Sequence, residues 1–193
     1  MAKKSPGSRA NATGKDFERD MARRLRQIYD SPSLLAEIET ATAKTRPSIL
    51  RQSSVRRGEQ RLGAREPDVV TPTTWWFELQ CSQEGSGRVD GTDKLAQAER
   101  DIRMGATQWI RPVVIYRRKG SNRVWVTLYY TVLACGLNWA PRRDALKFSH
   151  DMTVTIAWEA FETILKAEKA QNERQQDSSS GRGPSARASA ALA

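Results

Sequence analysis

The chain has 193 residues, 38% of them hydrophobic, and a formal net charge of +10 at pH 7 with an isoelectric point near 10.1. This size suits one domain with a buried core, and the basic excess predicts a polyanionic partner. Cys81 and Cys135 are too few and too far apart for a disulfide framework or a zinc site. No apolar run is long enough to span a membrane, so we expect no membrane partner and a cytoplasmic location.

The N-terminal region is expected to consist of a disordered basic leader, residues 1–13, followed by a first helix from Thr13 or Gly14. The apolar stripe of this helix recurs at three- and four-residue steps and consists of Phe17, Met21, Leu25 and Ile28. Glu18 borders the stripe. It is either part of a functional site or a surface acid paired with Arg19 or Arg23.

A basic segment follows. Ser31-Pro32 ends the first helix, and residues 34–42 are expected to form a short second one. Between positions 44 and 65 only one acid, Glu59, accompanies seven cations: Lys44, Arg46, Arg51, Arg56, Arg57, Arg61 and Arg65. Such runs are usually solvated faces, but the position of this one, before the hairpin described next, favours contact with a phosphate backbone. Ile49, Leu50 and Val55 suggest that part of the segment is a strand.

Residues 67–71 and 74–81 are expected to pair as a hairpin through a turn at Pro72. Strand alternation places Phe77, Leu79 and Cys81 on one face, and Glu78 and Gln80 on the other. Asp68 then lies beside Glu78 at the open end of the hairpin. Two carboxylates with water would suit Mg²⁺.

The next segment is a turn-rich loop, residues 83–92, which is a connector or a mobile lid. A helix capped by Thr92 or Asp93 should then run over residues 94–104 and end at Gly105. Its inner stripe consists of Leu95, Ala98 and Ile102. Gln97 lies beside this stripe, where it either faces a functional site or is exposed to solvent.

The C-terminal half reads as strand-rich. Residues 112–116 are typical of a strand buried on both faces, and residues 124–132 of a long strand after a basic turn. An irregular insertion (139–149), a last strand (153–156), a helix from Trp158 and a disordered tail (171–193) complete the chain. We therefore expect one α/β domain, residues 14–170, with a mixed central β-sheet flanked by helices.

The hairpin residues resemble the PD-(D/E)xK nuclease superfamily: Pro67-Asp68 is followed, ten positions after Asp68, by Glu78-Leu79-Gln80. The wider context is similar to phage-type Holliday junction resolvases and related small phage endonucleases. Three further matches carry that similarity: Gly14-Lys-Asp-Phe-Glu18, Arg56-Arg-Gly58 and Lys94-Leu-Ala-Gln-Ala-Glu99. The resemblance covers roughly positions 14–116 and implies a restriction-endonuclease-like core.

The resemblance also implies a set of site residues. The catalytic set would be Asp68, Glu78, Gln80 and Glu18, with Mg²⁺ or Mn²⁺ held by Asp68, Glu78 and the Leu79 carbonyl. The expected DNA-binding set comes mainly from the basic charge of the chain and consists of Lys15, Arg51, Arg56, Arg57, Arg61, Lys94, Gln97, Arg117 and Arg118. The resemblance further implies hydrolysis of DNA, including branched DNA, by a homodimer assembled through the terminal helix or residues 31–45. If the chain is phage-encoded, the location would be the host cytoplasm.

One residue departs from the family pattern, because Gln80 stands where the usual lysine would be. Lys94 or Lys15 could supply the missing charge. An alternative function is a catalytically weakened or inactive DNA-binding protein on a nuclease-like fold, and Gln80 is its main support. A third is a basic packaging or virion-associated protein without a site, for which alanine at Asp68 and Glu78 would change nothing.

Overall fold

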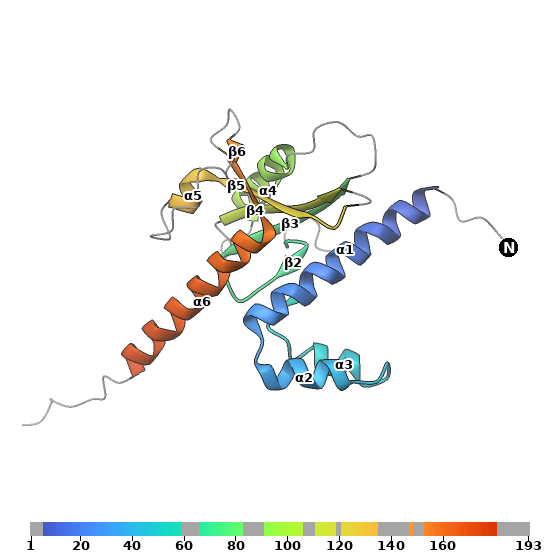
Figure 1. The fold of residues 1–193 in the computed structure, drawn as a ribbon, viewed down its shortest axis with the longest axis vertical. Helices are drawn as coiled ribbons and strands as arrows, with labels where there is room; N and C mark the ends of the chain where they lie inside the picture. Colours follow the sequence, from blue (N-terminus) through green and yellow to red (C-terminus); the bar gives the residue numbers. More distant parts are fainter. Residues whose placement is uncertain are drawn as a thin grey trace, which may run out of the picture.

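The computed structural model describes residues 6–58, 66–82, 91–105, 111–118, 121–134, 147–148 and 153–180. These residues form an α/β fold in which a mixed sheet lies between two layers of helices (Figure 1). Helix α4 (Thr92–Gly105) covers one face, and α1 (Pro6–Tyr29) and α6 (Trp158–Ser180) cover the other. The predicted α/β class with a mixed sheet flanked by helices is confirmed.

The described strands form one sheet in the order β1-β2-β3-β4-β5-β7-β6. They are β1 (Arg56–Arg57), β2 (Val69–Val70), β3 (Trp75–Ser82), β4 (Arg111–Arg118), β5 (Val124–Tyr129), β6 (Lys147–Phe148) and β7 (Thr153–Ala157). The β3–β4 pair is parallel and the other neighbouring pairs are antiparallel. A parallel pair needs a crossover, and α4 lies in the connection between β3 and β4, as expected from the strand–helix–strand order.

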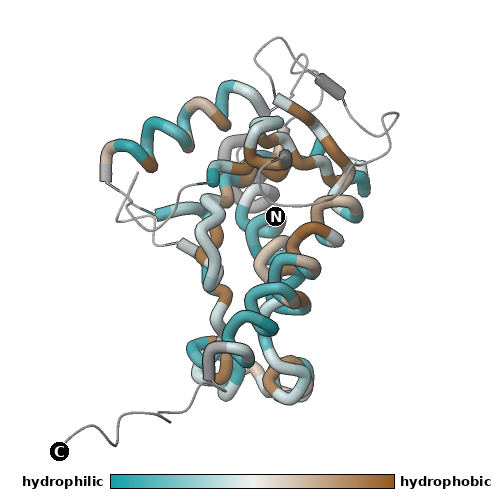
Figure 2. Tube along the Cα trace, turned by 90° about the vertical axis from the view of Figure 1, so that its left-hand side faces the viewer, coloured by the Kyte–Doolittle hydropathy of each residue, from teal (hydrophilic) through white to brown (hydrophobic). Residues whose placement is uncertain are grey.

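The main core lies between the sheet and the α1–α6 layer. The apolar stripe of α1 is buried as predicted, and Phe161 of α6 contacts Trp75 and Phe77 of β3 with ring centroids 5.3 and 6.5 Å apart. Residues 112–116 of β4 are all buried, which confirms the strand covered on both faces. The central strands are hydrophobic, and the helices alternate between polar and apolar residues (Figure 2).

The end of α1 is anchored to the chain before β1 by a buried carboxylate. Asp30 accepts hydrogen bonds from the Ser53 hydroxyl at 2.6 Å, the Ser54 hydroxyl at 2.7 Å and the Ser54 N–H at 3.0 Å. Both hydroxyls are thus engaged inside the protein. Between these points lie α2 (Pro32–Thr40), which begins after the cap Ser31, and α3 (Arg46–Leu50).

Several element boundaries differ from the expectations: α2 lies two residues earlier than expected, β2 is shorter, and β6 falls within the expected irregular insertion. Four further differences are larger or alter an element's type. Helix α1 begins at Pro6, well before Thr13, since proline is favoured in a first helical turn. Ile49 and Leu50 belong to α3, which Pro47 initiates, and the first strand begins only at Arg56.

The two other differences lie in the C-terminal half. Strand β5 ends at Tyr129, where its register with β7 ends, and α5 (Tyr130–Ala134) follows. Helix α6 continues to Ser180, because residues 171–178 are exposed and rich in helix-forming Gln, Glu and Arg. The expected leader before Pro6, the tail after Ser180, the 83–90 loop and most of the 139–149 insertion lie outside the described residues. Among the described helices, none is long and apolar enough to cross a membrane.

Candidate active site

The hairpin brings the two predicted acids together. Asp68 directly precedes β2, and its N–H donates to the Phe77 carbonyl at 3.0 Å. The Asp68 carboxylate accepts a hydrogen bond from the Leu79 N–H at 2.8 Å. Phe77 and Leu79 are the two neighbours of Glu78 in β3, so these two bonds hold Asp68 next to Glu78. The negative charge of Asp68 acts directly on Glu78, so the two carboxyl groups lie close together. The expected pairing at the open end of the hairpin is therefore present.

Burial makes this pair electrostatically costly. Glu78 is only 7% exposed, and burial, followed by the negative charge of Asp68, raises the pKa of Glu78 to about 7. Burial also raises the pKa of Asp68, and the charge of Glu18 adds to this effect. Two buried like charges that each disfavour ionisation would be stabilised by a cation between them.

The glycine of the Arg56-Arg57-Gly58 segment has a structural role. Its N–H donates to the Asp68 carbonyl at 2.9 Å, which ties the end of β1 to the backbone of the acid. A Cβ at this position would lie 1.9 Å from the Pro67 carbonyl oxygen, far inside van der Waals contact. The close approach of the two backbones therefore requires glycine.

Glu18 reaches the site through a basic neighbour. Its carboxylate forms a salt bridge with Arg57 of β1, and its charge acts on Asp68. Arg19 and Arg23 pair instead with Asp16 and Asp20. Of the two interpretations of Glu18, the geometry favours the one that places it at the edge of the site.

Helix α4 supplies the third side of the site. The Lys94 ammonium donates to the Gln97 side-chain oxygen at 3.1 Å, and its positive charge lowers the pKa of both Asp68 and Glu78. Asp101, seven residues after Lys94 on the same stripe, acts on Glu78 in the opposite sense. The sequence pattern could have indicated Asp101, because a residue seven positions after Lys94 and four after Gln97 lies on the same face of the helix. It was not among the predicted site residues.

Two further residues complete the strand side. The Trp76 indole N–H donates to Glu78 at 3.0 Å, a contact that the sequence pattern did not predict. Gln80 is half-buried, and strand alternation puts it on the same face as Glu78. The Leu79 side chain packs against the opposite, main core, as predicted.

The predicted DNA-binding cations do not form one continuous track. Lys15 of α1 and Arg118 of β4 are exposed, and the Arg117 guanidinium of β4 lies 4.8 Å from the Phe17 ring centroid of α1. Arg56 is held by Glu66 at 2.6 Å, in the same way that Arg57 is held by Glu18.

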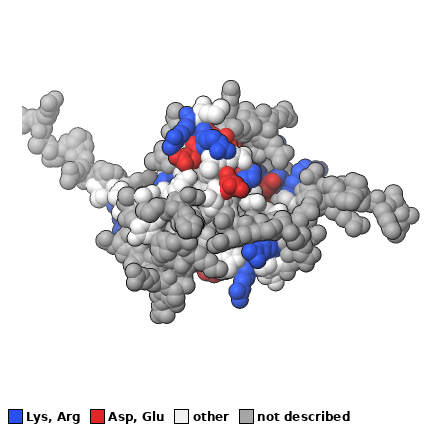
Figure 3. Space-filling view, turned by 90° about the horizontal axis from the view of Figure 1, so that it is seen from above, with Lys and Arg blue, Asp and Glu red and all other residues white. Residues whose placement is uncertain are grey.

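The remaining predicted cations are dispersed. Arg51 is exposed and follows α3 directly. Two residues of α3, Arg46 and Leu50, line a groove of about 580 Å³ together with residues on the outer side of α1. Arg61 lies outside the described residues. On the face seen from above, basic and acidic side chains of the described residues are intermixed (Figure 3).

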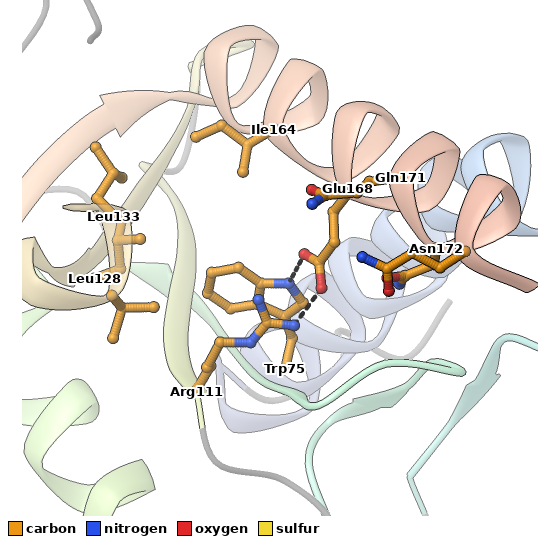
Figure 4. A pocket seen from close by; sticks show the side chains of 10 residues that line it. Trp75, Arg111, Leu128, Leu133, Ile164, Glu168, Gln171 and Asn172 are labelled. Atoms are coloured by element: carbon orange, nitrogen blue, oxygen red, sulfur yellow. Dashed lines mark hydrogen bonds and ion pairs between the residues drawn. The ribbon is translucent and has the colours of Figure 1, made fainter. Parts of the chain in front are cut away.

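A separate cavity of about 190 Å³ lies on the α6 side of the sheet. There Glu168 accepts from the Trp75 indole at 2.9 Å and forms a salt bridge with Arg111, whose guanidinium lies 4.2 Å from the Trp75 ring centroid (Figure 4). Trp75, Arg111 and Glu168 satisfy one another in this cavity, so these three residues have a structural explanation.

Comparisons of the chain with protein-family models, curated proteins and solved structures found no match.

Proposed function

We propose that this chain is a metal-dependent DNA endonuclease with a restriction-endonuclease-like core, selective for branched DNA in the manner of a Holliday junction resolvase. The observation that carries the proposal is the buried Asp68–Glu78 pair, with Glu18, Lys94 and Gln97 around it. Three separate elements, α1, the hairpin and α4, converge on this pair. The order hairpin, crossover helix and parallel strand agrees with the expected core.

The donor set fits Mg²⁺ or Mn²⁺. Asp68 and Glu78 offer hard carboxylate oxygens. Among the described residues, no group of three or more His, Cys, Asp and Glu side chains is placed so that it could hold a metal ion, so a cation here would depend on this pair, a backbone carbonyl and water. A site with few protein ligands leaves positions for water and phosphate, as magnesium sites commonly do. A bound ion would lower the pKa of a water molecule and polarise a phosphodiester oxygen. Asp68, Glu78 and the Leu79 carbonyl are the proposed ligands.

The surrounding residues have separate roles in this proposal. Lys94 places a positive charge near the two carboxylates, where it would offset charge developing on the phosphate. The Gln80 amide would orient the attacking water through hydrogen bonds. The Glu18–Arg57 salt bridge would keep Arg57 directed at the site until a phosphate competes for it.

The proposed partner is DNA, held by Lys15, Arg117 and Arg118, of which Lys15 and Arg118 are exposed and Arg117 is half-buried. Symmetric cutting of two strands would need two copies related by a two-fold axis. Helices α2 and α3 contain no buried residue and are therefore the proposed interface, with α6 as the second possibility considered from sequence.

The second candidate, an inactive DNA-binding protein on the same fold, is favoured by one observation. Gln80 brings no charge to the position where the resembled family has lysine. In this alternative Asp68 and Glu78 would remain without a catalytic role, although keeping two carboxylates buried together is costly.

Cleavage of a labelled four-way junction, compared with a linear duplex of the same sequence, tests the proposal. Wild type, Glu78→Ala and the surface control Glu162→Ala are assayed with Mg²⁺, Mn²⁺ and EDTA. We expect metal-dependent cutting of the junction by wild type and the control, and none by Glu78→Ala. Binding without cutting would support the inactive alternative, and equal cutting of both substrates would retain the nuclease and reject junction selectivity.

A further inference from the structure

Each carboxylate of the Asp68–Glu78 pair has one oxygen engaged by the protein. The Leu79 N–H donates to Oδ2 of Asp68 at 2.8 Å, and the Trp76 indole donates from Nε1 to Oε1 of Glu78 at 3.0 Å. The Asp68 bond comes from the strand backbone, which no substitution can remove easily. The Glu78 bond comes from a side chain, so it can be altered on its own.

Trp76 is in a fixed position. Its side chain is fully buried in a small second core with Ala98 of α4, and Val70 of β2 and Ile102 of α4 pack against it. The indole therefore has little rotational freedom, and its N–H is aimed at Glu78 by packing between the hairpin and α4. A donor held in this way fixes the carboxylate that accepts from it.

A carboxylate with one oxygen hydrogen-bonded is poorly suited to binding a cation through both oxygens. Ca²⁺ accepts bidentate carboxylates and six to eight ligands, whereas Mg²⁺ requires near-octahedral geometry and keeps several waters. A site of two single-oxygen carboxylates therefore favours Mg²⁺ over Ca²⁺.

We propose that Trp76 is a positioning residue that restricts Glu78 to a single free oxygen and thereby makes the site selective for Mg²⁺ over Ca²⁺. This inference rests on the proposed metal-dependent function. It assigns a role in metal choice to a buried tryptophan that would otherwise be explained by core packing alone.

The chain contains a matched control on the same strand. Trp75 also donates its indole N–H to a carboxylate, that of Glu168 at 2.9 Å, but on the opposite face of the sheet (Figure 4). Trp75→Phe and Trp76→Phe each remove one indole–carboxylate bond, partly buried at Trp75 and buried at Trp76, and each keeps an aromatic ring. Their effects on folding should be similar, whereas only Trp76→Phe alters the site.

The experiment is a titration of full-length protein, labelled with ¹⁵N at tryptophan, with Mg²⁺ and separately with Ca²⁺. The indole signal of Trp76 is assigned by its loss in Trp76→Phe. In wild type we expect Mg²⁺ to shift this signal, and Glu78→Gln to abolish the shift. Affinities for both ions are measured by calorimetry in wild type and the two phenylalanine variants.

For Trp76→Phe we expect Mg²⁺ affinity to fall by about tenfold or more, with a smaller loss for Ca²⁺, and for Trp75→Phe we expect wild-type values. If Trp76→Phe loosens the packing, benzothienylalanine at position 76 removes the donor and keeps the ring shape. Wild-type Mg²⁺ affinity and selectivity in these Trp76 variants would overturn this inference alone. No Mg²⁺ binding by wild type would overturn the metal site and, with it, the inference.

Discussion

At the scale of single residues, the site combines several acids with one ammonium group. Asp68, Glu78, Glu18 and Asp101 all contribute negative charge, and Arg57 compensates chiefly Glu18. Lys94 is the cation whose charge acts on both central carboxylates, whereas Lys15 is exposed on α1. Of the two lysines considered as substitutes for the missing motif lysine, the geometry therefore favours Lys94.

If Lys94 supplies that charge, Lys94→Ala should lower kcat for DNA cleavage by about 100-fold, because a charge directed at the reacting phosphate is lost. Adding Gln80→Lys to this variant should restore part of the rate by returning a cation to the motif position. Single-turnover cleavage at saturating protein measures both effects. Lys15→Ala is the matched control and should weaken DNA binding with little effect on kcat. An unchanged rate in Lys94→Ala would exclude the assignment.

At the scale of elements, the site depends on how closely β1 approaches the start of β2. Gly58→Ala should destabilise the fold by about 1–3 kcal/mol or more, because its Cβ would overlap the Pro67 carbonyl and displace Asp68. Gly14→Ala is a suitable control, since a Cβ there meets no atom within 4 Å, and alanine favours the helix. Urea unfolding gives the two free energies, and cleavage assays report the displacement of Asp68. A Gly58→Ala variant as stable as wild type would contradict this account.

The elements that could be predicted from sequence are those with a strong local pattern. The α1 stripe, the hairpin faces and the doubly buried β4 follow from periodicity and β-branched composition, and the structure confirms all three. Element ends were less predictable. The end of β5 at Tyr129 depends on where β7 ceases to pair with it, which is a property of two distant segments.

The candidate site was predictable to a similar extent. Asp68 and Glu78 follow from hairpin alternation, which is local. The Glu18–Arg57 salt bridge joins residues 39 positions apart, and the local alternatives Arg19 and Arg23 were equally reasonable from sequence. The Trp76–Glu78 bond could not be inferred because the direction of an indole N–H is set by packing against α4.

At the scale of the whole molecule, the buried pair makes folding stability depend on pH. Glu78 has an ordinary pKa of 4.5 and a folded-state pKa of about 7, chiefly because of burial. Between these pH values the folded chain keeps a proton that the unfolded chain has released. The contribution of Glu78 to the free energy of unfolding should therefore fall as pH rises from about 4.5 to 7, by an amount on the order of 3 kcal/mol.

Glu78→Gln isolates this contribution, because glutamine stays neutral throughout. In EDTA, the stability of wild type relative to Glu78→Gln should decrease from pH 5 to pH 8, so that the variant becomes the more stable protein at high pH. Urea unfolding at several pH values measures the difference, and Glu162→Gln on α6, where the carboxylate is partly exposed and pairs with Lys166, should show no such trend. Mg²⁺ should raise wild-type stability at pH 8 more than at pH 5, because the ion binds the ionised carboxylates and competes with protons at low pH. Parallel stability curves for wild type and Glu78→Gln would mean that Glu78 is already ionised at little cost, and the reason for expecting a cation at this site would be lost.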